Sequence, residues 1–240
     1  MDRPPREPAP RLILLPGLAS DARLFEPQRR AFPNLEVLPW LDPLPDERIE
    51  SYAQRMAGQV RPDPRPLFIG GVSFGAIVAL EAARHLWPDG VFLIGGGLSS
   101  RMIAWPFRWM CHLAPLAPLP IVPWLLKLFP LGLDLIEDLT DEQKQLYVRM
   151  SQATPPAMIR WGAHAMTKWE FTGPPPAPIH VIHGHDDRIV HPKRLQVDRW
   201  VKRGRHLISL SHPAVVNDFL AERMRARPPI TAHNANGASV

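Results

Sequence analysis

A chain of 240 residues, of which 45% are hydrophobic and 21% charged, has the composition of one globular α/β domain with room for an insertion. Its single cysteine, Cys111, excludes an internal disulfide and favours a reducing compartment, so we expect a cytoplasmic protein. The net charge is +5, but the sequence has no nucleic-acid-binding motif, so we do not expect nucleic acid as a partner. Prolines throughout 113–136, the most apolar stretch, argue against a membrane-spanning helix.

Six short apolar runs are predicted to be β-strands, because continuous apolar stretches of this length suit strands that are covered on both faces. In chain order, the runs lie at 12–15, 35–38, 67–71, 91–94, 179–182 and 206–210. Helical patterns lie at 51–59, 74–86, 192–201 and 213–225. Strands that alternate with helices predict an α/β fold with a mostly parallel six-stranded sheet and helices on both faces.

One long segment interrupts this alternation between the fourth and fifth runs. It is rich in proline, tryptophan and leucine and shows only helical patterns, and Thr140 followed by Gln143 marks a helix start within it. A helical insertion of this kind is expected to cover the sheet as a cap. The expected division is a core at 11–96 and 177–226, a cap at 97–176 and disordered tails at 1–10 and 227–240.

The strongest local motif is G-x-S-x-G, at Gly71-Val72-Ser73-Phe74-Gly75. An apolar strand leads into it and an apolar helix leaves it. A serine on so tight a turn adopts a strained backbone, and the residues two positions away must be small to avoid strand and helix. The alternative is a plain turn in which the serine caps the helix. The flanking pattern favours a nucleophile whose hydroxyl projects at the carboxyl end of the sheet.

Three further motifs follow predicted strands. Leu15-Pro16-Gly17-Leu18 comes after the first strand, and His183-Gly184-His185-Asp186-Asp187 comes after the fifth. Ser211-His212-Pro213 opens the last predicted helix. Parallel strands bring their carboxyl ends to the same edge of a sheet, so we expect these motifs to meet near the serine.

Together the four motifs resemble those of the α/β-hydrolase superfamily, in the expected order and from Leu12 to about Arg225. The resemblance implies that Ser73 is the nucleophile and that an acid and then a histidine follow it along the chain. By the spacing of the family's H-G-x-x-D loop, the acid is Asp187, and Asp186 is the alternative. The acid orients the histidine and stabilises its charged form.

The histidine assigned as the base is His212, because it lies near the C-terminus and opens a helix. Ser211 stands where the family usually has glycine. His185 and His191 are the competitors, and His183 is assigned a structural hydrogen bond in its loop. His206 is placed at the start of the sixth predicted strand, which is the wrong end from which to meet Ser73.

The resemblance also implies an oxyanion hole, which needs two preorganised donors. One donor is expected to be the backbone N–H of Phe74, directly after the nucleophile. The other is expected to be the N–H of Leu18, where Gly17 lets the backbone turn toward the substrate. Proline at position 16 replaces the histidine that often braces this loop, and a helix-capping loop is the alternative interpretation.

These assignments predict a serine hydrolase that cleaves carboxylic esters through an acyl-enzyme, without cofactor or metal. The substrate is expected to be a small ester with an apolar acyl group. A thioesterase or methyl ester esterase acting on acyl-carrier-protein-bound chains is the alternative, since the layout loosely resembles the pimeloyl-acyl-carrier-protein methyl ester esterases. Basic residues at Arg199, Lys202, Arg203 and Arg205 suit such an acidic partner, although they also suit a solvated surface. A non-catalytic ligand-binding relative is the alternative of another class.

Overall fold

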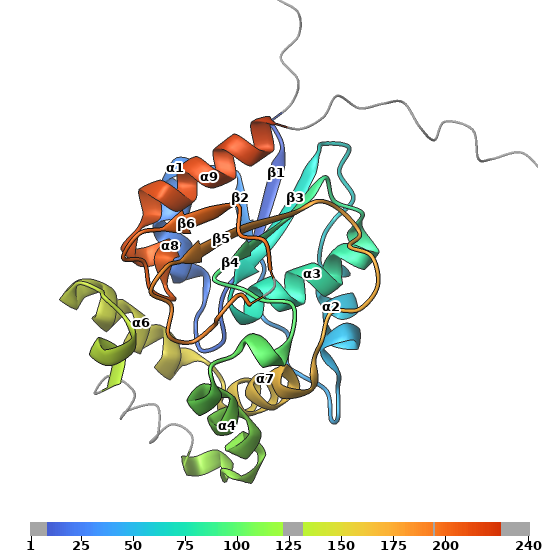
Figure 1. The fold of residues 1–240 in the computed structure, drawn as a ribbon. Coiled ribbons are helices and arrows are strands. Elements are labelled where there is room, and N and C mark those ends of the chain that lie inside the picture. Colours follow the sequence, from blue (N-terminus) through green and yellow to red (C-terminus); the bar gives the residue numbers. More distant parts are fainter. Residues whose placement is uncertain (1–8, 122–131, 194, 227–240) are drawn as a thin grey trace, which may run out of the picture.

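The computed structural model describes residues 9–121, 132–193 and 195–226. Within them, six strands form one sheet in the order β2-β1-β3-β4-β5-β6, and every neighbouring pair is parallel (Figure 1). The strands are β1 (Arg11–Leu15), β2 (Leu35–Val37), β3 (Leu67–Val72), β4 (Gly90–Ile94), β5 (Ile179–Gly184) and β6 (Arg199–Val201). The predicted α/β fold with a six-stranded sheet is confirmed. The expected tails fall largely at 1–8 and 227–240, outside the described residues.

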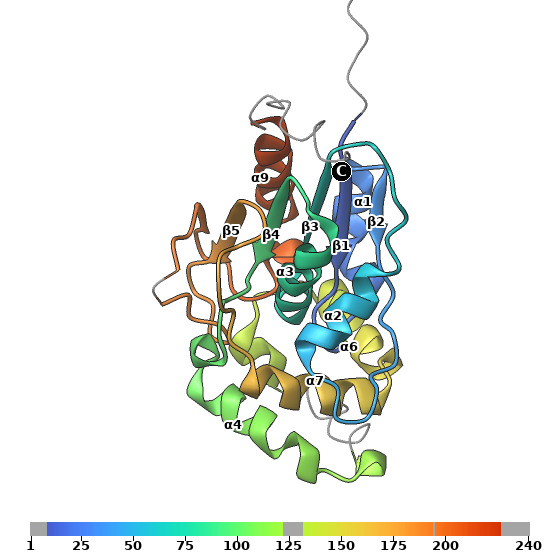
Figure 2. The ribbon, with the colours of Figure 1, turned by 90° about the vertical axis from the view of Figure 1, so that its right-hand side faces the viewer.

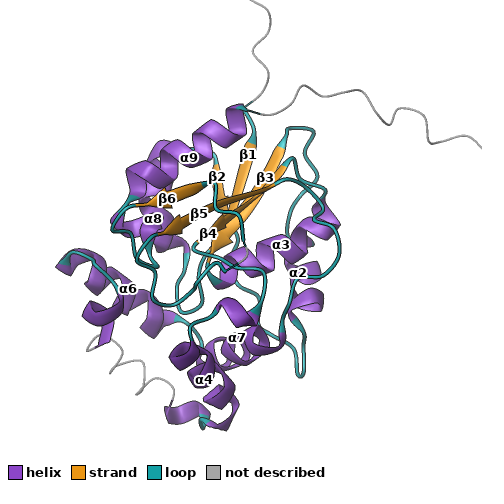
Figure 3. Cartoon of the chain, in the orientation of Figure 1, coloured by secondary structure: helices purple, strands orange, loops and turns teal. Residues whose placement is uncertain are grey.

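The central strands are apolar throughout because helices cover both of their faces. All five residues of β1 and of β4 are buried. Figure 3 shows the orange strands enclosed by purple helices. One face packs against α2 (Ile49–Ala57) and α3 (Phe74–Leu86). The other packs against η1 (Ala22–Phe25), α8 (Ile208–Ser211) and α9 (Pro213–Arg225), and α1 (Glu26–Ala31) contacts α8 and α9.

The sixth strand is not where the apolar runs predicted it. It lies at Arg199–Val201, and the run at 206–210 instead contains the short helix α8. The predicted helix at 192–201 is also wrong, since its described residues form a loop and then β6. An edge strand needs burial on one side only, and here Val201 is buried while Trp200 is 48% exposed. Such a strand has no continuous apolar run to reveal it.

The long insertion between β4 and β5 is helical where it is described. Its helices are η2 (Ser100–Met102), α4 (Trp105–Leu113), η3 (Ala114–Leu116), η4 (Leu119–Ile121), α6 (Asp141–Ala153) and α7 (Pro156–Lys168), with a further turn at 132–136. The predicted start of α6 is confirmed, because the Thr140 and Gln143 side chains form a reciprocal capping box.

Figures 1 and 2 place these helices beyond the carboxyl ends of the strands. The insertion therefore lies over the edge of the sheet to which the strand-end motifs project. In the described parts of the chain, no helix is both long enough and apolar enough to cross a membrane.

Replacing Phe219 with alanine tests the packing of α9 on the sheet. Phe219 is fully buried and meets Phe92 edge to face, with ring centroids 6.0 Å apart. Losing a buried phenyl ring leaves a cavity, so we expect the free energy of unfolding in urea to fall by about 3–5 kcal/mol. Leu116→Ala, at a side chain that is 76% exposed, is the control and is expected to change it by less than about 0.5 kcal/mol. Equal effects of the two substitutions would contradict this packing.

Candidate active site

Ser73 occupies a strained turn between β3 and α3. Its φ of 53° and ψ of −114° lie in a region that non-glycine residues rarely adopt. Its side chain does not cap α3, so the helix-capping alternative fails. A Cβ atom on Gly71 would overlap the backbone of Gly75, and one on Gly75 would overlap the backbone of Leu15. Both glycines of the motif are therefore required by the close approach of strand, turn and helix.

The end of β4 links this turn to His206. The amide of Ser73 donates a 3.0 Å hydrogen bond to the carbonyl of Ile94. The next residue, Gly95, has a φ of 59°, and a Cβ there would lie 3.6–3.7 Å from two atoms of the His206 ring. Ser73 and His206 thus lie against the same bend, although they are far apart in the sequence.

Asp187 holds the loop after β5 through both of its carboxylate oxygens. Oδ1 accepts hydrogen bonds from the amides of Ile189 (2.8 Å) and Val190 (3.0 Å). Oδ2 lies 2.8 Å from Nδ1 of His206 and 2.9 Å from Nε2 of His183. Burial by itself raises the pKa of Asp187, but the two histidines outweigh it and hold the pKa well below its usual range. The acid is therefore ionised and fully partnered.

His206 is the histidine that this carboxylate orients. The bond to Asp187 places the proton on Nδ1 and leaves the Nε2 lone pair to act as a base. Burial lowers the pKa of His206, whereas the charge and hydrogen bond of Asp187 and the charge of Glu137 raise it by more, so the net shift is upward. His206 thus gains a proton more readily than an ordinary histidine.

His212, the base assigned from the sequence, has a different hydrogen-bond partner. Its Nδ1 is 2.9 Å from the hydroxyl of its neighbour Ser211, at the start of α9. The structure pairs Asp187 with His206 and not with His212, so the assignment from the sequence and the geometry disagree. The sequence interpretation excluded His206 because it placed this residue at the start of the sixth predicted strand. In the structure it comes five residues after β6, at the carboxyl edge.

A local signal for His206 exists in the sequence. Gly204 lies two residues before it and closes a tight turn, since its amide donates a 3.0 Å hydrogen bond to the carbonyl of Val201. The family usually has glycine directly before the histidine; before His206 that position is Arg205, but a glycine two residues before a histidine that follows a strand is a related signal. This signal was overlooked because the sixth strand was predicted at 206–210 and not at Arg199–Val201.

The competing residues have other partners or positions. Asp186 pairs with His185 at 2.9 Å, and their side chains are 50% and 70% exposed. His183 makes the structural contact that was expected, since its Nε2 is 2.9 Å from both the Val190 carbonyl and Asp187. His191 is exposed, and its amide bonds to the carbonyl of Met102 in the insertion.

The two expected oxyanion donors belong to segments that adjoin Ser73. Phe74 is the first residue of α3, where amides have no partner within the helix. Neither its N–H nor that of Leu18 donates to an acceptor in the described part of the chain. A Cβ on Gly17 would lie 3.8 Å from the Cβ of Ser73, which brings this loop against the nucleophile. The Ser20 hydroxyl donates to the Gly17 carbonyl at 2.8 Å and braces the loop where Pro16 cannot.

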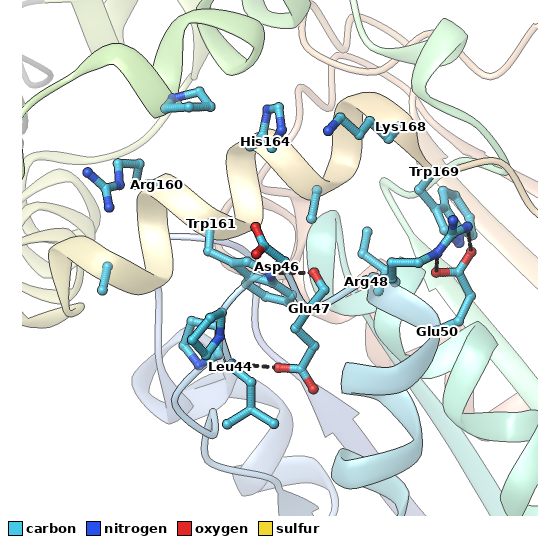
Figure 4. Close-up of a pocket in the computed structure, with 16 residues that line it drawn as sticks. Leu44, Asp46, Glu47, Arg48, Glu50, Arg160, Trp161, His164, Lys168 and Trp169 are labelled. Carbon is cyan, nitrogen blue, oxygen red and sulfur yellow. Dashed lines mark hydrogen bonds and ion pairs between the residues drawn. The ribbon is translucent and has the colours of Figure 1, made fainter.

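Helix α7 of the insertion packs over this site. The Trp161 ring meets Phe74 edge to face at 5.9 Å, and a Cβ on Gly162 would contact the Leu18 side chain. Trp161 also lines a pocket of about 670 Å³ between α7 and residues 43–50, drawn in Figure 4. Its indole N–H donates to the Glu47 carbonyl at 2.8 Å. Ser73 is not among the residues that line this pocket.

Comparison with known proteins gives a family match over most of the chain. A model described as the alpha/beta hydrolase family matches residues 7–219. No curated protein shows a significant sequence match. An esterase from Exiguobacterium antarcticum is similar in structure, with a TM-score of 0.70, 11% identity, and 92% of this chain and 93% of that chain covered. An esterase from Thermogutta terrifontis gives a TM-score of 0.66 at 15% identity, with 91% and 90% covered.

A third similar structure is YbtT, a type II thioesterase from the yersiniabactin biosynthetic pathway. It gives a TM-score of 0.61 at 17% identity, with 92% of this chain and 93% of that chain covered. At such identities these structures show a shared fold.

The network around Asp187 predicts a pH dependence of stability for Asp187→Asn. Because the folded pKa is depressed, the carboxylate stabilises the fold above the unfolded pKa of about 3.9, and this stabilisation is lost as pH falls toward the folded pKa. We expect the substitution to lower the free energy of unfolding at neutral pH by about 3 kcal/mol, because it leaves buried groups poorly paired. The difference from wild type should shrink below about pH 4.

Urea unfolding at a series of pH values measures this effect. Asp186→Asn is the matched control, because that carboxylate is half-exposed and, among the described residues, bonds only to the neighbouring His185. A loss of stability that is the same for both variants, or that does not vary with pH, would show that Asp187 lacks the role described.

Proposed function

Because the chain belongs to the alpha/beta hydrolase family, we propose that it is a serine esterase in which Ser73 is the nucleophile, Asp187 the acid and His206 the base. The observation that carries the proposal is the 2.8 Å contact between Asp187 and His206, beside the strained turn of Ser73. His206 replaces the His212 of the sequence assignment because it bonds the acid and shares the Gly95 bend with the nucleophile.

The proposed reaction has two steps. The hydroxyl of Ser73 attacks the ester carbonyl while Nε2 of His206 takes its proton. The N–H groups of Leu18 and Phe74 stabilise the oxyanion, and His206 then protonates the departing alcohol. Water, activated by the same histidine, releases the acid from the acyl-enzyme. Asp187 stabilises the imidazolium throughout.

The surroundings of the oxyanion loop support an apolar acyl group. Phe74 packs against Trp161 and, at 5.4 Å, against Trp40. The Leu18 side chain contacts α7 at Gly162. Aromatic and aliphatic walls favour hydrocarbon over charged groups. Esterases of similar fold support the assignment to ester hydrolysis.

A thioesterase acting on carrier-bound acyl chains is the second candidate, favoured by the structural likeness to YbtT. The basic residues after β5 support it less than the sequence suggested. Arg199 pairs with Glu222, and Arg205 donates to two backbone carbonyls of the insertion. A comparison of p-nitrophenyl esters, acyl thioesters and carrier-protein methyl esters as substrates separates the two candidates.

The nucleophile is tested by Ser73→Ala. We expect wild-type protein to hydrolyse p-nitrophenyl esters and to be labelled by a fluorophosphonate probe, and the variant to lose both. The expected loss in kcat is roughly 10⁴-fold or more, because the hydroxyl forms the covalent intermediate. A wild-type protein that neither hydrolyses nor labels would instead support a non-catalytic binding protein.

The base is tested by comparing His206→Ala with His212→Ala. We expect His206→Ala to lower kcat by roughly 10⁴-fold, because the serine then lacks a proton acceptor. His212→Ala is expected to change kcat less than about tenfold, since among the described residues its ring has a hydrogen bond only with Ser211 and none with Asp187. The reverse order of effects would restore His212 as the base and refute the proposal made here.

A further inference from the structure

A second carboxyl group is buried beside the loop that carries His206. Glu137 belongs to the insertion and is only 3% exposed. Its Oε2 accepts a 3.0 Å hydrogen bond from the amide of Leu207, the residue directly after His206. Its Oε1 is buried without a hydrogen-bond partner in the described part of the chain. An acid placed in this way contacts the histidine loop without being the acid that bonds its ring.

The insertion also forms hydrogen bonds with residues on both sides of His206 in the sequence. The guanidinium of Arg205 donates to the carbonyls of Asp134 (3.1 Å) and Glu137 (3.0 Å). The Gln143 amide donates to the carbonyl of Leu210 at 2.7 Å. These bonds and the carboxyl of Glu137 fix the insertion and the histidine loop against each other.

The charges around Glu137 couple it to His206. Burial raises the pKa of Glu137 to about 7. The negative charge of Asp187 also raises this pKa, whereas the positive charges of His206 and Arg205 lower it. Burial raises the pKa of Tyr147 on α6, and the charge of the nearby Glu137 raises it further. On the His206 side, the facing groups are Asp187, which His183 also contacts, and Glu137 itself. The histidine is therefore flanked by two carboxyl groups, one from the core and one from the insertion.

We propose that Glu137 is a positioning residue for the base, through which the insertion sets both the placement and the protonation of His206. The hydrogen bond to Leu207 holds the backbone beside the ring, and the negative charge favours the protonated imidazole. This rests on the proposed role of His206. It adds to that role because an acid outside the Ser73–His206–Asp187 set then determines the pH range of the reaction.

The direction of the effect follows from the charge. The base must be neutral to accept the proton of Ser73, so activity is lost as pH falls through the pKa of His206. Because the pKa of Glu137 is about 7, this carboxyl is partly ionised at neutral pH, where its charge raises the pKa of His206; removing the charge lowers that pKa. We expect Glu137→Gln to shift the acid limb of the kcat/KM profile downward by roughly 0.5–1 pH unit. Glutamine keeps an oxygen for the Leu207 amide and changes mainly the charge.

The experiment measures kcat/KM for a p-nitrophenyl ester against pH for wild type, Glu137→Gln and Asp138→Asn. Asp138 is the matched control, because it is the next carboxylate in the chain and is exposed, and its profile is expected to superimpose on that of wild type. Circular dichroism checks folding. Should Glu137→Gln not fold, Glu137→Met removes the same charge without burying a side-chain amide, although it also removes the acceptor of the Leu207 N–H.

A downward shift confined to the charge-removing variants at position 137 supports the proposal. A folded variant whose profile matches that of wild type overturns it, and so does the failure of both variants to fold, which would make Glu137 a structural residue only. A wild-type protein without esterase activity would refute the proposed function itself, which is a different outcome.

Discussion

The carboxylate of Asp187 is the group on which the rest of the site depends. A buried charge is costly unless donors surround it, and this one has two amides and the rings of His183 and His206. The same contacts that make its burial tolerable close the loop after β5 and fix the proton of His206 on Nδ1. The stability of this loop and the protonation of His206 therefore arise from one electrostatic arrangement.

The parallel sheet brings the parts of the site together. Every strand pair is parallel, so the residues that follow β1, β3, β4, β5 and β6 reach the same edge. Ser73 is held there in an unfavourable conformation because the close approach of β1, β3 and α3 leaves no other path for the chain. The strained conformation of Ser73 is therefore a consequence of how the sheet and α3 pack.

The insertion contributes to the site from the other side. Helix α7 places Trp161 and Gly162 against the two residues expected to supply oxyanion donors, which encloses them in apolar surroundings. The stretch around Glu137 reaches the histidine loop instead and carries charge. A segment that looks in sequence like a proline-rich interruption thus contacts the oxyanion loop and the neighbourhood of His206 separately.

The sequence by itself determined the alternation of strands and helices, the turn at Ser73 and the loop at Asp187, because each is encoded by neighbouring residues. The sequence did not predict the sixth strand correctly, because a half-exposed edge strand has no continuous apolar run. His206 was therefore assigned to the wrong end of a strand. Which histidine meets Asp187 depends on how separate loops pack at the edge of the sheet, and only the tertiary structure decided it. The burial of Glu137 is of the same kind, because its partner Leu207 lies 70 residues away.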